Sequence, residues 1–159
     1  MANGAVSVKG RALRYLAQRE HSRQELERKL ARRVDDTEQA SAQQQIARAL
    51  DELTAAGLLS ESRAAASVLR SQGQRYGVRR LKQTLQSKGL DAELISTTLQ
   101  QAHSTELERA REVWRRRFGT PPASAAERAR QMRFMAGRGF EGDVIRRVVQ
   151  GADEDRGTD

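Results

Sequence analysis

The residue types that most often carry enzyme chemistry are scarce in this chain. The sequence contains no cysteine and two histidines, His21 and His103, which lie far apart and in no metal-ligand spacing such as H-E-x-x-H. It contains neither a phosphate-binding G-x-x-x-x-G-K-[ST] loop nor a nucleophile elbow. We therefore predict no catalytic residue, no cofactor and no metal, and we expect a binding protein rather than an enzyme.

One histidine and one acidic segment offer alternatives to this view. His21 precedes Ser22, which has the type and spacing of a helix cap, so we assign His21 to local structure or to solvent exposure. Asp35, Asp36 and Glu38 could together hold a divalent ion, but the same segment is typical of a solvated loop. We favour the loop.

Positive charge is the stronger chemical signal. The formal net charge is +8 over 159 residues, which predicts an acidic partner: nucleic acid, an acidic protein groove, or both. Of the 29 Lys and Arg residues, the lysines are only Lys9, Lys29, Lys82 and Lys88. The planar fork of arginine suits phosphate and carboxylate recognition, although GC-rich codons would produce the same excess. The net positive field is the same in either case.

The basic residues that we predict to contact a partner form three clusters along the chain. The alternative is that each cluster is only the solvated face of a helix. The predicted residues are Arg28, Lys29, Arg32 and Arg33; then Arg75, Arg79, Arg80, Lys82 and Lys88; and finally Arg115, Arg116 and Arg117. We favour the middle cluster because Tyr76 and Gly77 precede Arg79 and Arg80 at the expected start of a helix. Backbone amides and side chains could bind one anion together there.

The elements that must position these residues are helices. Four segments have the spacing of a helix capping box, and four glycines stand where a helix would end in a left-handed residue. The expected caps are Ser22, Ser41, Thr105 and Ser124, and the expected helix-ending glycines are Gly57, Gly89, Gly119 and Gly139. Apolar residues recur at helical spacing between these positions, Trp114 and Phe118 among them as core residues. This pattern predicts nine helices.

Two stretches 50 residues apart, KGLDAELI from Lys88 and RGFEGDVI from Arg138, have nearly the same pattern. We interpret both as the junction between the second and third helices of a three-helix repeat, with Leu90 and Phe140 turned inward. The corresponding first junction lacks glycine and should be a longer loop. The expected fold class is all-α: three tandem three-helix, helix-turn-helix-like repeats in an elongated, curved array. The expected boundaries are 9–59, 60–103 and 104–151, with flexible tails at 1–8 and 152–159.

These segments also resemble the RecX regulatory proteins. The stretches ALRYLAQREHSRQELERKL and LDELTAAGLLSESRAA are similar to the opening of that family, and RYGVRRLKQTLQSKGLD and RQMRFMAGRGFEGDVI to its later segments. The matching positions in the opening are Ala12, Leu13, Leu16, Arg19, Ser22, Glu25, Leu26, Lys29 and Leu30, then Gly57, Leu58, Leu59, Arg63 and Ala65. The chain departs from the family pattern at Glu61, where aspartate is usual, and at Ala64, where an aromatic residue is usual.

The resemblance implies a modulator of the RecA recombinase. Members of the family are understood to lodge in the helical groove of the RecA–single-stranded DNA filament and to restrain its growth, ATP hydrolysis, strand exchange and co-protease activity. We accordingly expect a monomeric cytoplasmic protein with weak, sequence-independent contact with single-stranded DNA. No signal peptide is evident, and no apolar run approaches the roughly 20 residues that span a membrane. The alternatives are a helix-turn-helix protein that binds DNA directly, and a general scaffold.

Overall fold

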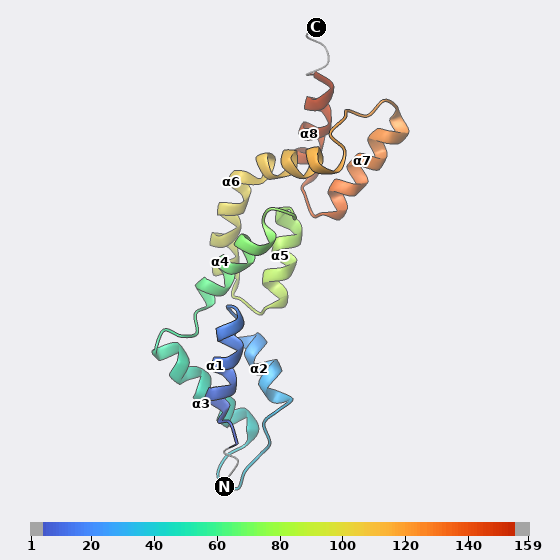
Figure 1. Ribbon diagram of the computed structural model, residues 1–159. Coiled ribbons are helices and arrows are strands. Elements are labelled where there is room, and N and C mark those ends of the chain that lie inside the picture. Colours follow the sequence, from blue (N-terminus) through green and yellow to red (C-terminus); the bar gives the residue numbers. More distant parts are fainter. Residues whose placement is uncertain (1–4, 155–159) are drawn as a thin grey trace. The chain divides into compact units, whose positions relative to one another are not determined.

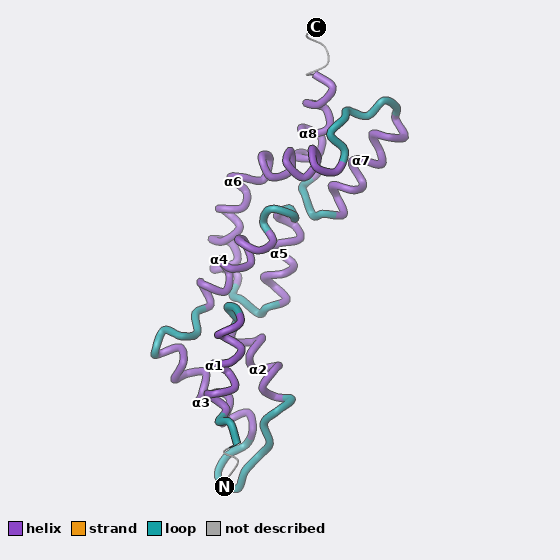
Figure 2. Tube along the Cα trace, in the orientation of Figure 1, coloured by secondary structure: helices purple, strands orange, loops and turns teal. Residues whose placement is uncertain are grey.

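The computed structural model describes residues 5–154, which form eight α-helices and no strand (Figures 1 and 2). In chain order they are α1 (Val8–Gln18), α2 (Arg23–Ala31), α3 (Ala42–Ala55), α4 (Glu61–Gln72), α5 (Val78–Ser87), α6 (Ala92–Arg117), α7 (Ala125–Gly137) and α8 (Gly142–Glu154). The all-α fold class is confirmed. No helix within residues 5–154 is both long enough and apolar enough to cross a bilayer.

The helices belong to two compact units. The first contains residues up to Ser67 together with Ser87–Asp91, and the second contains Val68–Gln86 and the chain from Ala92 onward. In the first unit α1, α2 and α3 enclose a core of Ala12, Leu26, Leu30, Ile46, Leu50, Leu53 and Leu59. In the second, α6, α7 and α8 enclose Ala110, Trp114, Met135, Phe140, Val144, Ile145, Val148 and Val149. Trp114 is a core residue as predicted, and Phe118 packs against the same cluster.

The predicted helix starts are largely confirmed. Ser22 and Ser41 form reciprocal capping boxes with Glu25 and Gln44. At α7, Ser124 accepts the amide proton of Glu127, while the Glu127 carboxylate accepts from Ala123 instead of from Ser124. A cap of this kind stabilises a helix by about 1 kcal/mol. The capping residues that identify these helix starts in the sequence therefore also stabilise them.

The predicted glycine turns are confirmed as well. Gly57, Gly89, Gly119 and Gly139 have φ values of +72°, +72°, +67° and +86°, the left-handed region that favours glycine. The repeated motif ends α5 and α7 in the same way, and Leu90 and Phe140 after the turn are both buried. The first junction, between α2 and α3, is the longer loop that was expected; within it Thr37 and Ala40 bond to each other.

The expectation of nine helices is wrong for residues 5–154. The helices predicted to lie on either side of Thr105 are one continuous helix, α6, which runs across the expected boundary between residues 103 and 104. No glycine or proline interrupts the sequence between Asp91 and Gly119, so nothing stops the helix. The Thr105 hydroxyl donates to the carbonyl oxygen of Ala102, one turn back, at 3.4 Å. Thr105 is therefore not a cap.

Candidate functional site

The start of α5, the favoured anion site, is occupied by the turn between α7 and α8. The Gly77 amide donates to the Arg138 carbonyl oxygen at 2.9 Å, and the Arg79 amide donates to that of Gly139 at 3.0 Å. Between them, the Val78 amide donates to Oε1 of the buried Glu106 at 3.2 Å. These backbone donors are satisfied inside the protein, so the part of the prediction that used them to bind an anion is wrong.

This contact requires glycine on both sides. A Cβ atom on Gly77 would collide with the carbonyl oxygen of Gly139 and with the backbone of Phe140. A Cβ atom on Gly139 would collide with Cβ of Arg80 and lie 2.7 Å from its backbone nitrogen. The close approach of two backbones places the Arg138 side chain beside the residues that begin α5.

The first unit contains the equivalent contact of the other repeated turn. The Ser22 hydroxyl donates to the Lys88 carbonyl oxygen at 2.6 Å, and the Lys88 ammonium pairs with Glu25 at 2.8 Å. Burial alone would raise the pKa of Glu25, but hydrogen bonds from Arg19, Lys88 and the Ser22 amide outweigh it and lower the pKa to about 2. Lys88, which is only 17% exposed, is therefore a structural residue of the first unit.

In the second unit, arginine side chains gather on the ring of Tyr76. The Arg80 Cζ atom lies 4.2 Å from the ring centroid, and those of Arg75 and Arg138 lie 5.7 and 5.6 Å from it. Arg109 fixes the loop that carries the ring, because its guanidinium donates to the Tyr76 carbonyl oxygen at 2.7 Å and to that of Gly73 at 2.6 Å. These distances are typical of cation–π contacts.

The same pattern continues onto α7 and the end of α6. Arg138 and Arg117 lie 5.1 and 5.3 Å from the centroid of Phe134, and Arg117 also lies 5.3 Å from that of Phe118. The two phenyl rings meet edge to face, with centroids 5.4 Å apart. We name this set the arginine–aromatic row. Its members are Arg75, Tyr76, Arg80, Arg117, Phe118, Phe134 and Arg138, with Arg130 at its end, 5.9 Å from Phe118.

The row unites predicted residues with residues that sequence reasoning missed. Arg75 and Arg80 from the middle cluster join Arg117 from the third, but Arg138 and Arg130 were not predicted. A signal for them existed: Arg130 and Phe134 lie four residues apart on α7, and Arg138 follows after four more residues as the C-cap of that helix. The contact with Tyr76 has no such signal, because it depends on the docking of two turns.

The remaining predicted residues have other environments. Arg115 and Arg116 pair with Glu112 at 3.5 and 3.2 Å, which neutralises part of their charge. Arg79 and Lys82 are exposed on α5. In the first unit, Arg28 donates to the Ser87 carbonyl oxygen and Arg32 is exposed at the end of α2.

Lys29 has a structural partner. Its ammonium lies 4.8 Å from the Tyr15 ring and 2.9 Å from Nε2 of His21. An ammonium group only donates, so Nε2 of His21 accepts and its Nδ1–H donates to the Arg19 carbonyl oxygen at 2.9 Å. Burial, and then the neighbouring cations Arg19 and Lys29, lower the pKa of His21. His21 is thus a neutral, buried structural residue.

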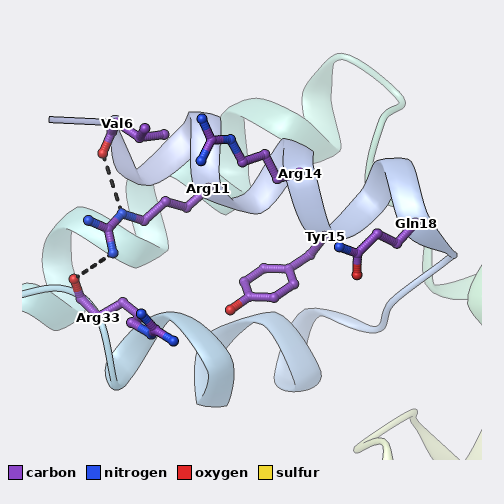
Figure 3. A pocket seen from close by; sticks show the side chains of 6 residues that line it. All are labelled: Val6, Arg11, Arg14, Tyr15, Gln18 and Arg33. Atoms are coloured by element: carbon purple, nitrogen blue, oxygen red, sulfur yellow. Dashed lines mark hydrogen bonds between the residues drawn. The ribbon is translucent and has the colours of Figure 1, made fainter. Parts of the chain in front are cut away.

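The last predicted residue, Arg33, lines a hollow of about 400 Å³ beside α1 (Figure 3). The Arg11 guanidinium closes one side of this hollow by donating to the carbonyl oxygens of Val6 and Arg33 at 3.4 and 3.1 Å. Tyr15 and Gln18 line the other side. Arg11 is committed to the backbone here, which indicates a role in holding the N-terminal segment against the chain that follows α2.

Two groups of acidic side chains have the residue types of a metal site. Asp36 accepts the Ala42 amide proton at 2.6 Å, which agrees with the loop interpretation of that segment. Ligand atoms of His103, Glu106 and Glu141 lie within 4.8 Å of one another. Oε1 of Glu106 already accepts the amide protons of Val78 and Glu141, at 3.2 and 3.3 Å. We therefore assign Glu106 a structural role at the starts of two helices.

Comparison with known proteins covers nearly the whole chain. The first, second and third three-helix domains of RecX match residues 9–53, 60–99 and 104–149. The regulatory protein RecX of Leptothrix cholodnii is 51% identical over 154 residues, which cover 97% of this chain and 94% of that protein. That of Ralstonia nicotianae is 45% identical, covering 93% and 89%.

A solved structure agrees in fold. The crystal structure of RecX from Lactobacillus salivarius matches with a TM-score of 0.74 at 22% identity, covering 92% of this chain and 95% of that one. The three domain matches follow one another along the chain, and the two copies of the repeated motif lie in the second and third of the predicted repeats. Together with the identity to full-length relatives, they show that the chain belongs to the RecX family of regulatory proteins.

Proposed function

We propose that this chain is a non-catalytic regulator that binds the RecA–single-stranded DNA filament in its helical groove and inhibits recombinase, ATPase and co-protease activity. Such a protein acts in DNA repair, recombination and the SOS response, as a monomer in the cytoplasm. The observation that carries the proposal is the match of three consecutive RecX domains along a chain whose residues 5–154 form eight helices.

The charge distribution supports this proposal. The filament groove expected from the resemblance is lined by acidic side chains and underlain by DNA phosphates. The chain carries a net charge of +8, and arginines are exposed in both of its units. Attraction between such surfaces speeds encounter and makes binding sensitive to salt.

The proposal is tested by the RecA ATPase on single-stranded DNA. Arg79→Glu with Arg80→Glu reverses two exposed charges on α5. We expect the concentration for half-inhibition to rise by roughly ten-fold or more, with unchanged circular dichroism. Arg146→Glu with Arg147→Glu is the matched control, because it makes the same charge change at two adjacent exposed positions of α8.

Four results would count against the proposal or its site. If the α5 variant inhibits as potently as the wild type, α5 is not the binding site. If the control variant loses as much potency as the α5 variant, the effect comes from net charge alone. Failure of the wild-type protein to inhibit removes the function. Preferred binding to one duplex sequence, without RecA, would favour a helix-turn-helix protein that acts on DNA directly.

A further inference from the structure

The arginine–aromatic row of the second unit contains five guanidinium groups that form no salt bridge among the described residues. Arg75, Arg80, Arg117 and Arg130 are exposed, and Arg138 is half-buried. From this row we infer that the second unit has a docking surface for the sugar–phosphate backbone of a single-stranded nucleic acid. The inference rests on the proposed function, because it names the part of the regulator that meets the DNA, yet its test needs no RecA.

The rings hold the guanidinium groups in place. Arg80 and Arg138 contact the same ring of Tyr76, and Arg138 and Arg117 contact the same ring of Phe134. Because each guanidinium lies within about 6 Å of the centroid of the shared ring, two cations on one ring lie no more than about 10 Å apart, and an anion bound beside them would reduce their mutual repulsion. A guanidinium that contacts a ring can still offer N–H groups to a phosphate, and the contact with the ring reduces the side-chain entropy that is lost on binding.

The same contacts decide what kind of recognition the row allows. The rings of Tyr76 and Phe134 are each contacted by at least two arginines, so they are poor platforms for bases. Stacking on bases is what most single-strand-binding surfaces add to backbone contacts. The row therefore recognises phosphate rather than base, and binding should not depend on sequence.

A nucleic-acid strand fits this row better than an acidic peptide. The backbone of a nucleic acid carries one anion per nucleotide in a regular series. The guanidinium groups of the row also form a series, because each neighbouring pair contacts a common ring. A flexible single strand can adjust its phosphate spacing to groups that the protein holds fixed, whereas the phosphates of a duplex are fixed themselves. Arg115 and Arg116, only one and two residues from Arg117, pair with Glu112 and lie outside the row.

The test is fluorescence anisotropy of a labelled oligothymidylate with the full chain, across a salt series. Arg80→Gln with Arg138→Gln should weaken binding roughly ten-fold and lower the salt slope by about 1.4, since each neutralised phosphate contributes about 0.7 for a single strand. Arg115→Gln with Arg116→Gln removes the same charge outside the row and should weaken binding less than about two-fold. Arg80→Lys with Arg138→Lys keeps the charge but loses the planar fork, and should weaken binding with the slope retained.

Each outcome decides the inference. Equal loss in the two Gln variants shows general charge attraction and overturns it. Three other results would also overturn it: tighter binding of poly-glutamate than of oligothymidylate, a preference for duplex DNA over single-stranded DNA, and wild-type affinity of the Lys variant. The ATPase assay separates this inference from the proposed function. If the protein inhibits RecA but does not bind oligothymidylate, only the inference about the arginine–aromatic row is contradicted. If it binds oligothymidylate but does not inhibit RecA, only the proposed regulatory function is contradicted.

Discussion

The amide of Gly77 donates to the carbonyl oxygen of Arg138 at 2.9 Å, and this bond joins the start of α5 to the turn between α7 and α8. The equivalent turn after α5 contacts the start of α2 through Ser22 and Lys88. We call each copy of the repeated Lys/Arg-Gly motif a connector, because its turn bonds to the start of a helix earlier in the chain, α2 for the first copy and α5 for the second. In the second unit the connector also brings Arg138 to Tyr76 and so completes the arginine–aromatic row.

The tightest point of this connector should not tolerate a side chain. Gly139→Ala puts a Cβ at a φ of +86° and against the backbone of Arg80. We expect the free energy of unfolding to fall by about 3 kcal/mol, from the left-handed conformation and from overpacking together. Gly137→Ala is the control: nothing lies within 4 Å of its added Cβ, and α7 should gain up to about 1 kcal/mol. Urea unfolding measures both, and equal effects would contradict the docking.

Glu106 should be more important than its neighbours on α6. Glu106→Ala leaves the amides of Val78 and Glu141 without their shared acceptor, which we expect to cost about 3 kcal/mol of unfolding free energy. Glu106→Gln keeps an acceptor oxygen and should cost clearly less. Glu108→Ala, at an exposed position, should stay within about 0.5 kcal/mol. A loss at Glu106 no larger than at Glu108 would show that this carboxylate does not hold the two helix starts.

Acid should destabilise the first unit through Glu25. The folded-state pKa of Glu25 is about 2, against 4.5 for the free side chain, so its stabilisation is complete above about pH 5 and is lost as the pH falls toward 2. Between pH 5 and pH 2.5 we expect the wild type to lose about 2 kcal/mol more than Glu25→Gln. Urea titrations at pH 5 and pH 2.5 measure the difference. An equal loss of unfolding free energy in the two proteins would contradict the claim that the Glu25 carboxylate stabilises the fold through its ion pairs.

His21 should add a second acid step at higher pH. Burial lowers its pKa below the ordinary 6.5, so the fold holds the neutral ring, and the associated stability is present above pH 6.5 and declines below it. An NMR titration of the His21 ring should therefore give a midpoint below 6.5. A midpoint at or above 6.5 would mean that the ring is charged in the fold and that the contact with Lys29 is broken.

Local features of this fold could be predicted from sequence. Ser22 and Ser41 mark helix starts because their caps use only residues three positions away, and Gly89 and Gly139 mark turns because the required backbone conformation is local. Thr105 misled because a hydroxyl inside a helix can bond one turn back instead of capping. The elongated, curved arrangement expected of the repeats stays a prediction.

The site was less predictable because it is made by tertiary contacts. The amides after Tyr76 face Arg138 and Gly139, about 60 residues away in sequence, so they looked free when read locally. Lys88 was grouped with α5 by its position, but its partner is Glu25. The basic clusters did locate Arg80 and Arg117, while charge alone could not show that rings hold them beside Arg138.

The central claim is that the chain binds a RecA–single-stranded DNA filament. The most direct measurement is a pull-down of the protein on bead-bound single-stranded DNA at near-physiological salt, with RecA and a non-hydrolysable ATP analogue. We predict strong retention when RecA, DNA and nucleotide are all present, and weak retention on DNA alone. Equal retention with and without RecA, or none with the complete filament, would contradict it.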